Sequence, residues 1–347
     1  MRWSRAAGVT LALVCVAALA ASLFGVEAPP PTRAPRPARH TPAAPSASQI
    51  ASAIVPDLAE VRANVGAATL DGTGIVVSPN GVVLTDNHVI DGASDIRVTD
   101  LADGRTYHAT ALGYDVDADV AVLALSGATG LPSAPVADFA GAHVGAVVVA
   151  LAAEPDRRPT HVAAGGRVVA SGTSIVSRSQ ITGASRPLAG LLESSAAAGP
   201  GFSGGPLVDS GGRVVGMTVA YATTGAATRS YAVPSDEVRS IANDVVQHRA
   251  QLGVHVGPTA GLGVEISPVR SIGAVVVHVP AGSPLASAGL GAGDVIDTVT
   301  GAPVTSPTSL GEALLAHRPG QQVWVQWLTP KDVVRRAEDT LAPGPPA

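Results

Sequence analysis

The chain has 347 residues, 46% of them hydrophobic, and its formal net charge at pH 7 is −5. Five arginines and one acidic residue lie in residues 1–40, so the remainder of the chain holds 17 basic and 26 acidic residues. A folded part this acidic is a poor binder of phosphate, and we expect no nucleic-acid partner. The length suits about two domains.

The cysteine and motif content narrows the chemistry further. The only cysteine is Cys15, which leaves no intramolecular disulfide, no thiolate metal cluster and no cysteine nucleophile in the folded part. The sequence also lacks a His-Glu-x-x-His motif. We therefore expect neither a metal ion nor another cofactor.

The N-terminus carries a segment typical of export. Arg2 and Arg5 precede the uncharged, apolar run 6–26, which is the pattern of a signal peptide. A run of about 21 apolar residues is also long enough to cross a bilayer as a helix. Residues 1–28 are therefore interpreted as a signal peptide or an N-terminal membrane anchor, and both remain open. In either case we expect the rest of the chain outside the cytoplasm, secreted or tethered to the cell membrane through residues 6–26.

The next segment, 29–51, is expected to be a disordered linker. It is rich in proline and has little apolar content beyond alanine, so it cannot form a core. From 52 to 250 the sequence instead shows many short, valine-rich runs between turns. The clearest is 72–85, where two such runs flank a turn at Pro79, Asn80 and Gly81. Short strands without alternating helices favour β-barrels over a parallel α/β sheet.

One segment of this region has a different period. Residues 234–248 place Val238, Ile241 and Val245 at helical spacing, and Ser235 is the expected N-cap. This pattern predicts a helix that closes the β-rich domain.

The stretch GPGFSGGPL at 199–207 holds Ser203 on a tight loop of glycine and proline. Such a serine can act as a nucleophile if a histidine base and an orienting acid lie beside it. His88, where an apolar strand ends in a polar turn, is the best placed histidine. His108 lies inside an alternating strand, and His143 is a third candidate. These positions alone do not exclude a simple glycine-rich turn around Ser203.

Asp119 is the best placed acid, because it directly precedes the apolar run VAVLAL and so lies at the mouth of a buried strand. Asp115 and Asp117 are interpreted as ordinary loop acids. The chain order His88, Asp119, Ser203 is that of the chymotrypsin-type triad.

Three blocks around these residues resemble HtrA-like (Deg) serine proteases. They are LTDNHVI around His88, GYDVDADVAVLAL around Asp119 and GPGFSGGPL around Ser203. The resemblance implies a mainly β fold, a chymotrypsin-like double β-barrel, over residues 52–250. It also implies that the backbone N–H groups of Gly201 and Ser203 form the oxyanion hole. The composition is similar to that of secreted actinobacterial members.

The chain departs from the family pattern near the nucleophile. Phe202 stands where the family usually has Asn, and its ring either packs on the barrel or narrows the cleft. The stretch AAEPDRRP at 152–159 replaces the family's Gly-Asn-Pro-Phe-Gly loop, and Ser195 replaces an acid. These differences put regulation and specificity in doubt more than the chemistry.

The sequence restarts near 258, and residues 253–330 resemble a bacterial PDZ domain, a small α+β fold. The resemblance implies that Gly261, Leu262, Gly263 and Val264 bind the carboxylate of a peptide C-terminus through backbone N–H groups. Leu310, Leu314 and Leu315 repeat at helical spacing and are expected to floor the apolar groove for that peptide. Residues 331–347 are expected to be a disordered tail.

Together these patterns predict a serine endopeptidase that acts on exported, unfolded or misfolded proteins, with polypeptide substrates and a possible homo-oligomeric state. The alternative is a catalytically weak, protease-like scaffold that acts as a chaperone or adaptor through its PDZ domain, and Phe202 is its one sequence argument. An esterase is a further alternative, but the chain lacks a Gly-x-Ser-x-Gly motif in a strand–elbow–helix context.

Overall fold

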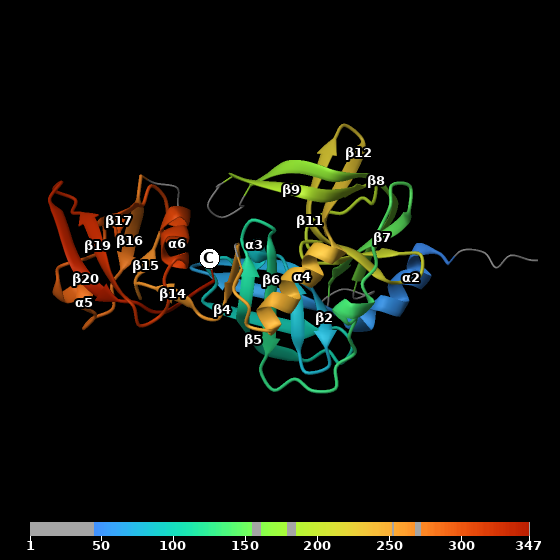
Figure 1. Ribbon diagram of the computed structural model, residues 1–347, viewed down its shortest axis with the longest axis horizontal. Coiled ribbons are helices and arrows are strands. Elements are labelled where there is room, and N and C mark those ends of the chain that lie inside the picture. The colour runs from blue at the N-terminus through green and yellow to red at the C-terminus, as the bar shows by residue number, and fades with distance from the viewer. Residues whose placement is uncertain (1–44, 155–160, 179–184, 252, 268–271, 347) are drawn as a thin grey trace, which may run out of the picture. The chain divides into compact units, whose positions relative to one another are not determined.

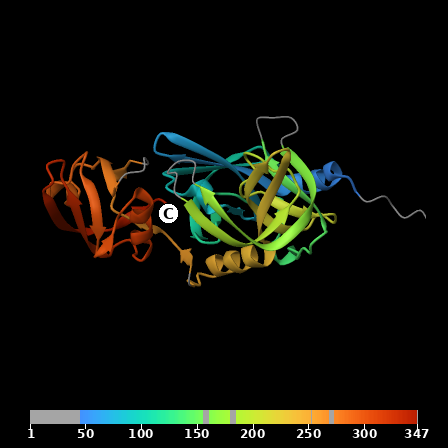
Figure 2. The same ribbon diagram turned by 90° about the horizontal axis from the view of Figure 1, so that it is seen from above.

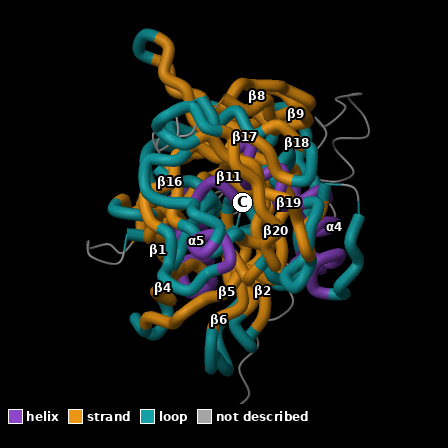
Figure 3. Tube along the Cα trace, turned by 90° about the vertical axis from the view of Figure 1, so that its left-hand side faces the viewer, coloured by secondary structure: helices purple, strands orange, loops and turns teal. Residues whose placement is uncertain are grey.

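The structure, a computed structural model, describes residues 45–154, 161–178, 185–251, 253–267 and 272–346 (Figure 1). Strands dominate it and helices are few and short (Figure 3). The expected signal peptide or anchor and most of the expected linker lie outside the described residues. None of the described helices is long and apolar enough to cross a membrane.

The described chain begins with helix α2 (Ala47–Ile54), followed by a 3₁₀ turn at Val55–Asp57. The Ser46 hydroxyl caps α2 by accepting the Gln49 N–H, and the Gln49 Oε1 in turn accepts the Ser46 backbone N–H. Ile50, Ala51 and Ile54 are buried in the main hydrophobic core. The prediction of a linker up to residue 51 was therefore wrong at its C-terminal end, because a capped, apolar helical face follows the prolines directly.

The first barrel consists of six strands that close into a ring. They are β1 (Leu58–Val65), β2 (Ala68–Ser78), β3 (Val82–Thr85), β4 (Asp95–Asp100), β5 (Thr106–Asp115) and β6 (Val120–Leu125). Pairing of β5 with both β4 and β6 closes the ring. The expected hairpin at 72–85 is confirmed, with Gly81 at φ +81° in its turn. A short helix, α3 (Asn87–Ile90), connects β3 to β4.

The second barrel is also a closed ring of six strands. They are β7 (Val147–Ala153), β8 (His161–Arg178), β9 (Ser185–Ser194), β10 (Pro206–Asp209), β11 (Val214–Thr224) and β12 (Ala227–Pro234). A 3₁₀ turn at Val136–Asp138 lies between the two barrels in the chain. The double β-barrel expected from the sequence is thus confirmed.

Helix α4 (Ser235–Val246) follows the second barrel (Figure 2). Val238, Ile241 and Val245 are buried, as their spacing predicted. Its N-cap is Pro234 rather than Ser235, because the Ser235 hydroxyl donates to the Ala140 carbonyl at 2.7 Å instead of capping the helix.

After α4 the chain returns to the first barrel before it enters the C-terminal module. Strand β13 (Val254–Val256) pairs antiparallel with the end of β5. The two backbones approach so closely that a Cβ on Gly113 would collide with the His255 carbonyl oxygen. Residues 254–256 therefore belong to the barrel sheet, although the sequence placed them in the C-terminal domain.

The C-terminal module has its own sheets, helices and core. Its elements are β14 (Thr259–Gly261), β15 (Glu265–Ile266), β16 (Ala274–His278), α5 (Pro284–Ser287), β17 (Val295–Val299), β18 (Ala302–Pro303), α6 (Pro307–Leu315), β19 (Gln322–Leu328), β20 (Val334–Thr340) and β21 (Ala342–Gly344). The core includes Trp327, Leu285 and Ile296, all fully buried.

The expected disordered tail is part of this module. Strand β20 pairs with β19 over seven residue pairs, and β21 pairs with β14. Five of the seven side chains of β20 are exposed, which explains why this segment looks polar in sequence. The prediction for 331–347 was wrong because backbone pairing, together with the buried Leu341, orders a strand that has little apolar content.

Candidate active site

Ser203 lies on the loop that precedes β10, and several hydrogen bonds fix this loop. The Ser203 carbonyl accepts from the Thr73 N–H at 2.8 Å, and the Gly204 N–H donates to the Thr218 carbonyl at 2.8 Å. Gly204 has φ +80°, and a Cβ there would collide with the Thr73 carbonyl and the Thr85 hydroxyl. Glycine after Ser203 is therefore a steric requirement of the loop.

His88 reaches Ser203 from the first barrel. It lies on α3, the four-residue helix that directly follows β3. Its Nε2 is 3.1 Å from the Ser203 Oγ, and its side chain is 38% exposed. An imidazole nitrogen at this distance can accept the serine proton.

Asp119 orients the imidazole from the other side. Its Oδ2 is 2.7 Å from the His88 Nδ1, and its Oδ1 accepts the His88 backbone N–H at 2.8 Å. Asp119 has φ +60°, a left-handed conformation that costs a non-glycine residue roughly 1–2 kcal/mol. Asp115, interpreted from the sequence as an ordinary loop acid, holds this turn by accepting the N–H groups of Asp117 and Ala118.

The charges of this pair reinforce each other. Burial alone would raise the pKa of Asp119, but the charge and hydrogen bonds of His88 outweigh burial and lower it. Burial likewise would lower the pKa of His88, but Asp119, with smaller contributions from Asp86 and Asp91, raises it to about 9. The imidazole therefore favours its protonated form at neutral pH.

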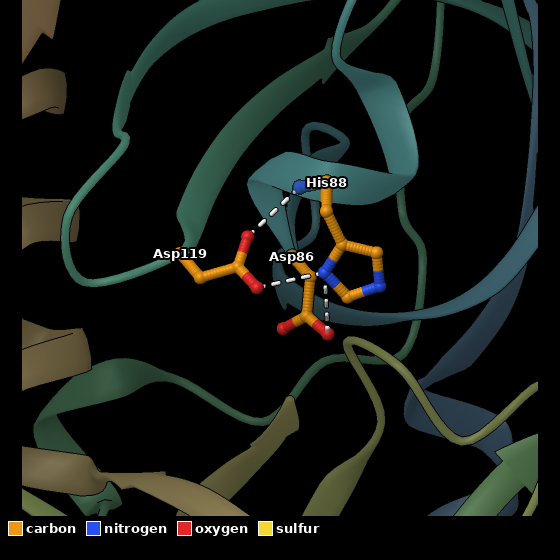
Figure 4. Close-up of side chains that lie close together, drawn as sticks. All are labelled: Asp86, His88 and Asp119. Atoms are coloured by element: carbon orange, nitrogen blue, oxygen red, sulfur yellow. Dashed lines mark hydrogen bonds and ion pairs between the residues drawn. The ribbon is translucent and has the colours of Figure 1, made fainter. Parts of the chain in front are cut away.

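A third side chain, Asp86, lies beside the same imidazole (Figure 4). Its Oδ2 is 3.8 Å from the His88 Nδ1, and the ligand atoms of Asp86, His88 and Asp119 all lie within 4.8 Å of one another. A cation among these atoms would have to replace the Nδ1 proton, which the 2.7 Å contact with Asp119 holds in place. We therefore interpret the three residues as a proton-holding cluster rather than a metal site.

The backbone around Gly201 is suited to an oxyanion. Gly201 has φ +84°. Its carbonyl accepts from the Thr73 hydroxyl, whereas the N–H groups of Gly201 and Ser203 donate to no protein oxygen in the described part of the chain. Two unused N–H groups beside a serine hydroxyl are what an oxyanion hole requires.

Thr73 is a residue that the sequence analysis missed. Its hydroxyl donates to the Gly201 carbonyl at 2.7 Å and accepts the Ala153 N–H at 2.9 Å, so it joins the nucleophile loop to both barrels. In sequence Thr73 is one more polar residue beside a valine-rich strand, and no local pattern distinguishes it.

Other candidates lie elsewhere. His108 is exposed on β5 beside Asp95, and His143 is also exposed, so neither reaches Ser203. Phe202 is only 5% exposed and packs in the core of the second barrel. The first of the two possibilities for its ring is therefore the one observed. Most of the 152–159 stretch lies outside the described residues.

The residues expected to bind a peptide C-terminus lie at the start of the C-terminal module. Gly261 ends β14, where a Cβ would contact the Gly344 backbone, and Leu262 is buried in the core. Gly263 has φ +64°. Among the described residues, the N–H groups of Leu262, Gly263 and Val264 have no backbone or side-chain acceptor.

Helix α6 contributes mainly to packing. Leu310 and Leu314 of α6 are buried in the module core, and only Leu315 is partly exposed. Leu310 and Leu314 therefore contribute to the core of the module rather than to an exposed surface.

Comparison with known proteins agrees with this architecture. Residues 72–217 match the family described as trypsin-like peptidase domain, and residues 260–335 match the PDZ domain family. The chain is 29% identical to the serine protease PepD of Mycobacterium tuberculosis, covering 96% of this chain and 76% of PepD. It is 32% identical to the serine protease Do-like HtrA of Lactococcus lactis subsp. cremoris, covering 74% of this chain and 67% of that protein.

Two further matches are of the same kind. The chloroplastic protease Do-like 1 of Arabidopsis thaliana is 33% identical over 79% of this chain and 64% of its own length. A solved serine endoprotease from Yersinia pestis is 25% identical, with a TM-score of 0.49, over 86% of this chain and 98% of that one. From the two domains and the sequence relatives together, the chain belongs to the HtrA family of serine endopeptidases.

Proposed function

We propose that this endopeptidase cleaves exported, unfolded or misfolded proteins with His88, Asp119 and Ser203 as its catalytic triad. The observation that carries the proposal is the continuous connection from Asp119 through His88 to Ser203, at 2.7 and 3.1 Å. The order of donor and acceptor atoms is the one that a serine nucleophile needs.

Each residue then has a defined task in peptide hydrolysis. The Ser203 Oγ attacks the scissile carbonyl carbon while the His88 Nε2 takes the serine proton. The oxyanion that forms is stabilised by the N–H groups of Gly201 and Ser203. Asp119 stabilises the imidazolium through Nδ1, and His88 then gives its proton to the leaving amine. Water repeats the sequence on the acyl-enzyme and releases Ser203.

Substitution of the nucleophile tests this assignment. Ser203→Ala is expected to abolish casein cleavage and fluorophosphonate labelling with an unchanged circular dichroism spectrum. Asp119→Asn is expected to lower turnover on the order of 10⁴-fold, because the imidazole loses its orientation. Full activity in Ser203→Ala would contradict the triad. The alternative of a catalytically weak scaffold has lost its sequence argument, since Phe202 is buried in the core of the second barrel.

The residues before Ser203 support a preference for apolar substrates. Residues 195–199 contain no carboxylate, so a cationic substrate side chain bound there would lack a partner at a cost of several kcal/mol. We expect cleavage after Val, Ala, Leu or Met. Mass-spectrometric mapping of cleavage sites in a denatured protein checks this, and a majority of cuts after Lys and Arg would refute it.

The C-terminal module is proposed to bind peptide C-termini. The available N–H groups of Leu262, Gly263 and Val264 support a carboxylate site. These three residues follow Gly261, which the sequence also assigns to this site. Affinity is expected to be micromolar, about −8 kcal/mol. Calorimetric titration of residues 258–346 with peptides that end in a free carboxylate or an amide tests the site. Equal affinity for both peptides would exclude a carboxylate site.

The proposed location is outside the cytoplasm. One relative, from Pseudomonas savastanoi, is named a probable periplasmic serine endoprotease, and this chain begins with the basic and apolar residues of an export segment. An alkaline phosphatase fused after residue 51 should be active, since that enzyme folds only in an oxidising compartment. Fractionation of the native protein then separates a cleaved signal peptide from a membrane tether at 6–26.

A further inference from the structure

Asp86 occupies the N-cap position of α3 but does not cap the helix. Its backbone has φ −76° and ψ 145°, as an N-cap residue should, yet its side chain accepts no hydrogen bond from the first turn. An aspartate at this position ordinarily accepts one of those N–H groups. The carboxyl group instead lies beside the His88 ring, with Oδ2 3.8 Å from Nδ1 (Figure 4). The side chain is therefore directed at the catalytic histidine.

The surroundings of Asp86 disfavour an isolated negative charge. The residue is completely buried, and neither carboxyl oxygen has a hydrogen-bond partner in the described part of the chain. The N–H of Gly204 lies close by, but its hydrogen bond goes to the Thr218 carbonyl. A buried carboxylate without donors is stable only if it keeps a proton or faces a cation. Among the described residues, the cation within reach of Asp86 is the His88 imidazolium.

Other charged groups around the pair add to this effect. Burial raises the pKa of Asp86 well above its usual value, and the negative charge of Asp119 raises it further, while His88 lowers it. Asp91, at the C-terminal end of α3, also acts on His88. Arg186 of β9 opposes these acids, since its charge acts on Asp119 and Asp91. Three carboxyl groups therefore favour a proton on the imidazole.

We propose that Asp86 is a second carboxylate partner of His88 that holds one extra proton in the active site and so keeps the protease at rest until the pH rises. This inference rests on the proposed role of His88 as the general base. It does not depend on the identity of the substrate.

The positions of the protons in the cluster explain both the resting state and the active state at higher pH. At rest, Asp86 and Asp119 are ionised and His88 carries protons on Nδ1 and Nε2, so Nε2 cannot accept the Ser203 proton. The negative charge of Asp86 on the Nδ1 side of the ring stabilises this doubly protonated imidazolium. At higher pH the Nε2 proton leaves to water, which makes Nε2 a base. The three groups thus titrate as one unit.

The pH dependence of kcat/KM on a short peptide tests the proposal. In the native protein the acidic limb should lie near pH 9, since only neutral His88 is a base. In Asp86→Asn it should lie at least about one pH unit lower, which raises kcat/KM at pH 7 about ten-fold. The ratio of the two activities should fall as the pH rises through 9. EDTA in every assay removes any contribution from bound cations.

Two matched substitutions serve as controls. Asp91→Asn also removes one negative charge near His88, but not the 3.8 Å contact that Asp86 makes with the ring. It should lower the pH of the acidic limb by less than Asp86→Asn does. Asp138→Asn changes an exposed acid in the 3₁₀ turn at 136–138 and should leave the limb where it is. An acidic limb at the same pH in the native protein and in Asp86→Asn would overturn the proposal.

A second measurement separates this proposal from the triad itself. NMR titration of the His88 ring in a Ser203→Ala background needs no activity, so it remains informative if the proposed function fails. The His88 midpoint should fall when Asp86→Asn is added. If Asp86→Asn does not fold, Asp86→Ala removes the same charge. The His88 midpoint of the Ser203→Ala protein alone also tests the proposal. A His88 midpoint near the ordinary 6.5 there would overturn the proposal.

Discussion

A single hydroxyl, that of Thr73, joins three parts of the active site. It holds the Gly201 carbonyl of the nucleophile loop and the Ala153 N–H of β7, while the Thr73 backbone binds Ser203. Thr73 itself belongs to β2 in the first barrel and is fully buried. The geometry of the nucleophile therefore depends on a residue 128 positions away from Gly201.

Thr73→Val keeps the shape of this side chain and removes both hydrogen bonds. We expect a loss of about 1–3 kcal/mol in the free energy of unfolding, because a buried N–H and carbonyl are left unpaired. We also expect roughly a ten-fold fall in kcat/KM, since the Gly201 peptide loses its anchor. Urea denaturation and the rate of fluorophosphonate labelling measure the two effects.

Thr218→Val is the matched control. The Thr218 side chain is also buried, but its hydroxyl has no hydrogen-bond partner within the described residues. Its removal should change stability little, because no partner is stranded. If the two valine variants were equally stable and equally active, the role assigned to Thr73 would be wrong.

At the level of single residues, the sequence leads to the proposed triad but not to the residues that support it. His88, Asp119 and Ser203 could be proposed because each lies in a short motif and the three occur in a known order. Thr73 and Asp86 could not, because their roles arise from contacts between segments distant in the chain and from burial. The cap expected at Ser235 failed for the same reason, since its hydroxyl binds Ala140, far away in sequence.

Among the elements, β20 shows how a polar strand can be essential. It is the edge strand of its sheet, and both of its faces expose charged side chains, Arg335 on one face and Arg336 and Glu338 on the other. The Arg336 guanidinium also lies 5.5 Å from the centre of the Trp324 ring, a cation–π distance. Apolar periodicity identifies buried strands and helices well, but it misses an edge strand whose order comes from backbone pairing. Helix α2 was also missed in the sequence, because it is short and directly follows a proline-rich segment.

A chain that ends at Lys331 tests the importance of β20 and β21. It leaves β19 without its seven-residue partner and removes the buried Leu341, so the C-terminal module should unfold at a lower temperature. Trp327 is fully buried there, and its fluorescence should shift to the red in the truncated protein. A chain that ends at Gly344 is the control. Identical fluorescence melting curves for the two truncations would show that β20 and β21 contribute nothing.

On the scale of the whole molecule, the proposed catalytic and peptide-binding sites belong to different parts of the chain. All the groups assigned to hydrolysis lie between residues 73 and 204, and the proposed carboxylate site begins at Gly261. The order of the two domains could be predicted from the sequence, because each has its own motifs. Their boundary could not, because β13 carries no apolar signal longer than three residues.

Removal of the C-terminal module tests this division of labour. Truncation after Gly257 should leave hydrolysis of a short peptide largely intact, weaken cleavage of an unfolded protein and abolish any activation by added peptide. Truncation after His248 removes β13 as well, and should in addition lower the stability of the first barrel. Equal cleavage of casein by the full chain and by the Gly257 truncation would exclude a substrate-binding role for the module.

The pairing of β13 with β5 also gives the molecule a mechanical property. A pull on the chain beyond residue 259 would first load the hydrogen bonds of Thr259 with Tyr114 and of Gly257 with Leu112, and then open the three pairs of β13 with β5 in turn, starting at Val256 and Gly113. The last pair to open is Val254 with Asp115, and Asp115 ties the turn that carries Asp119. These contacts therefore take up a weak force, and a force must open all of them before it reaches Asp119, the acid of the proposed triad.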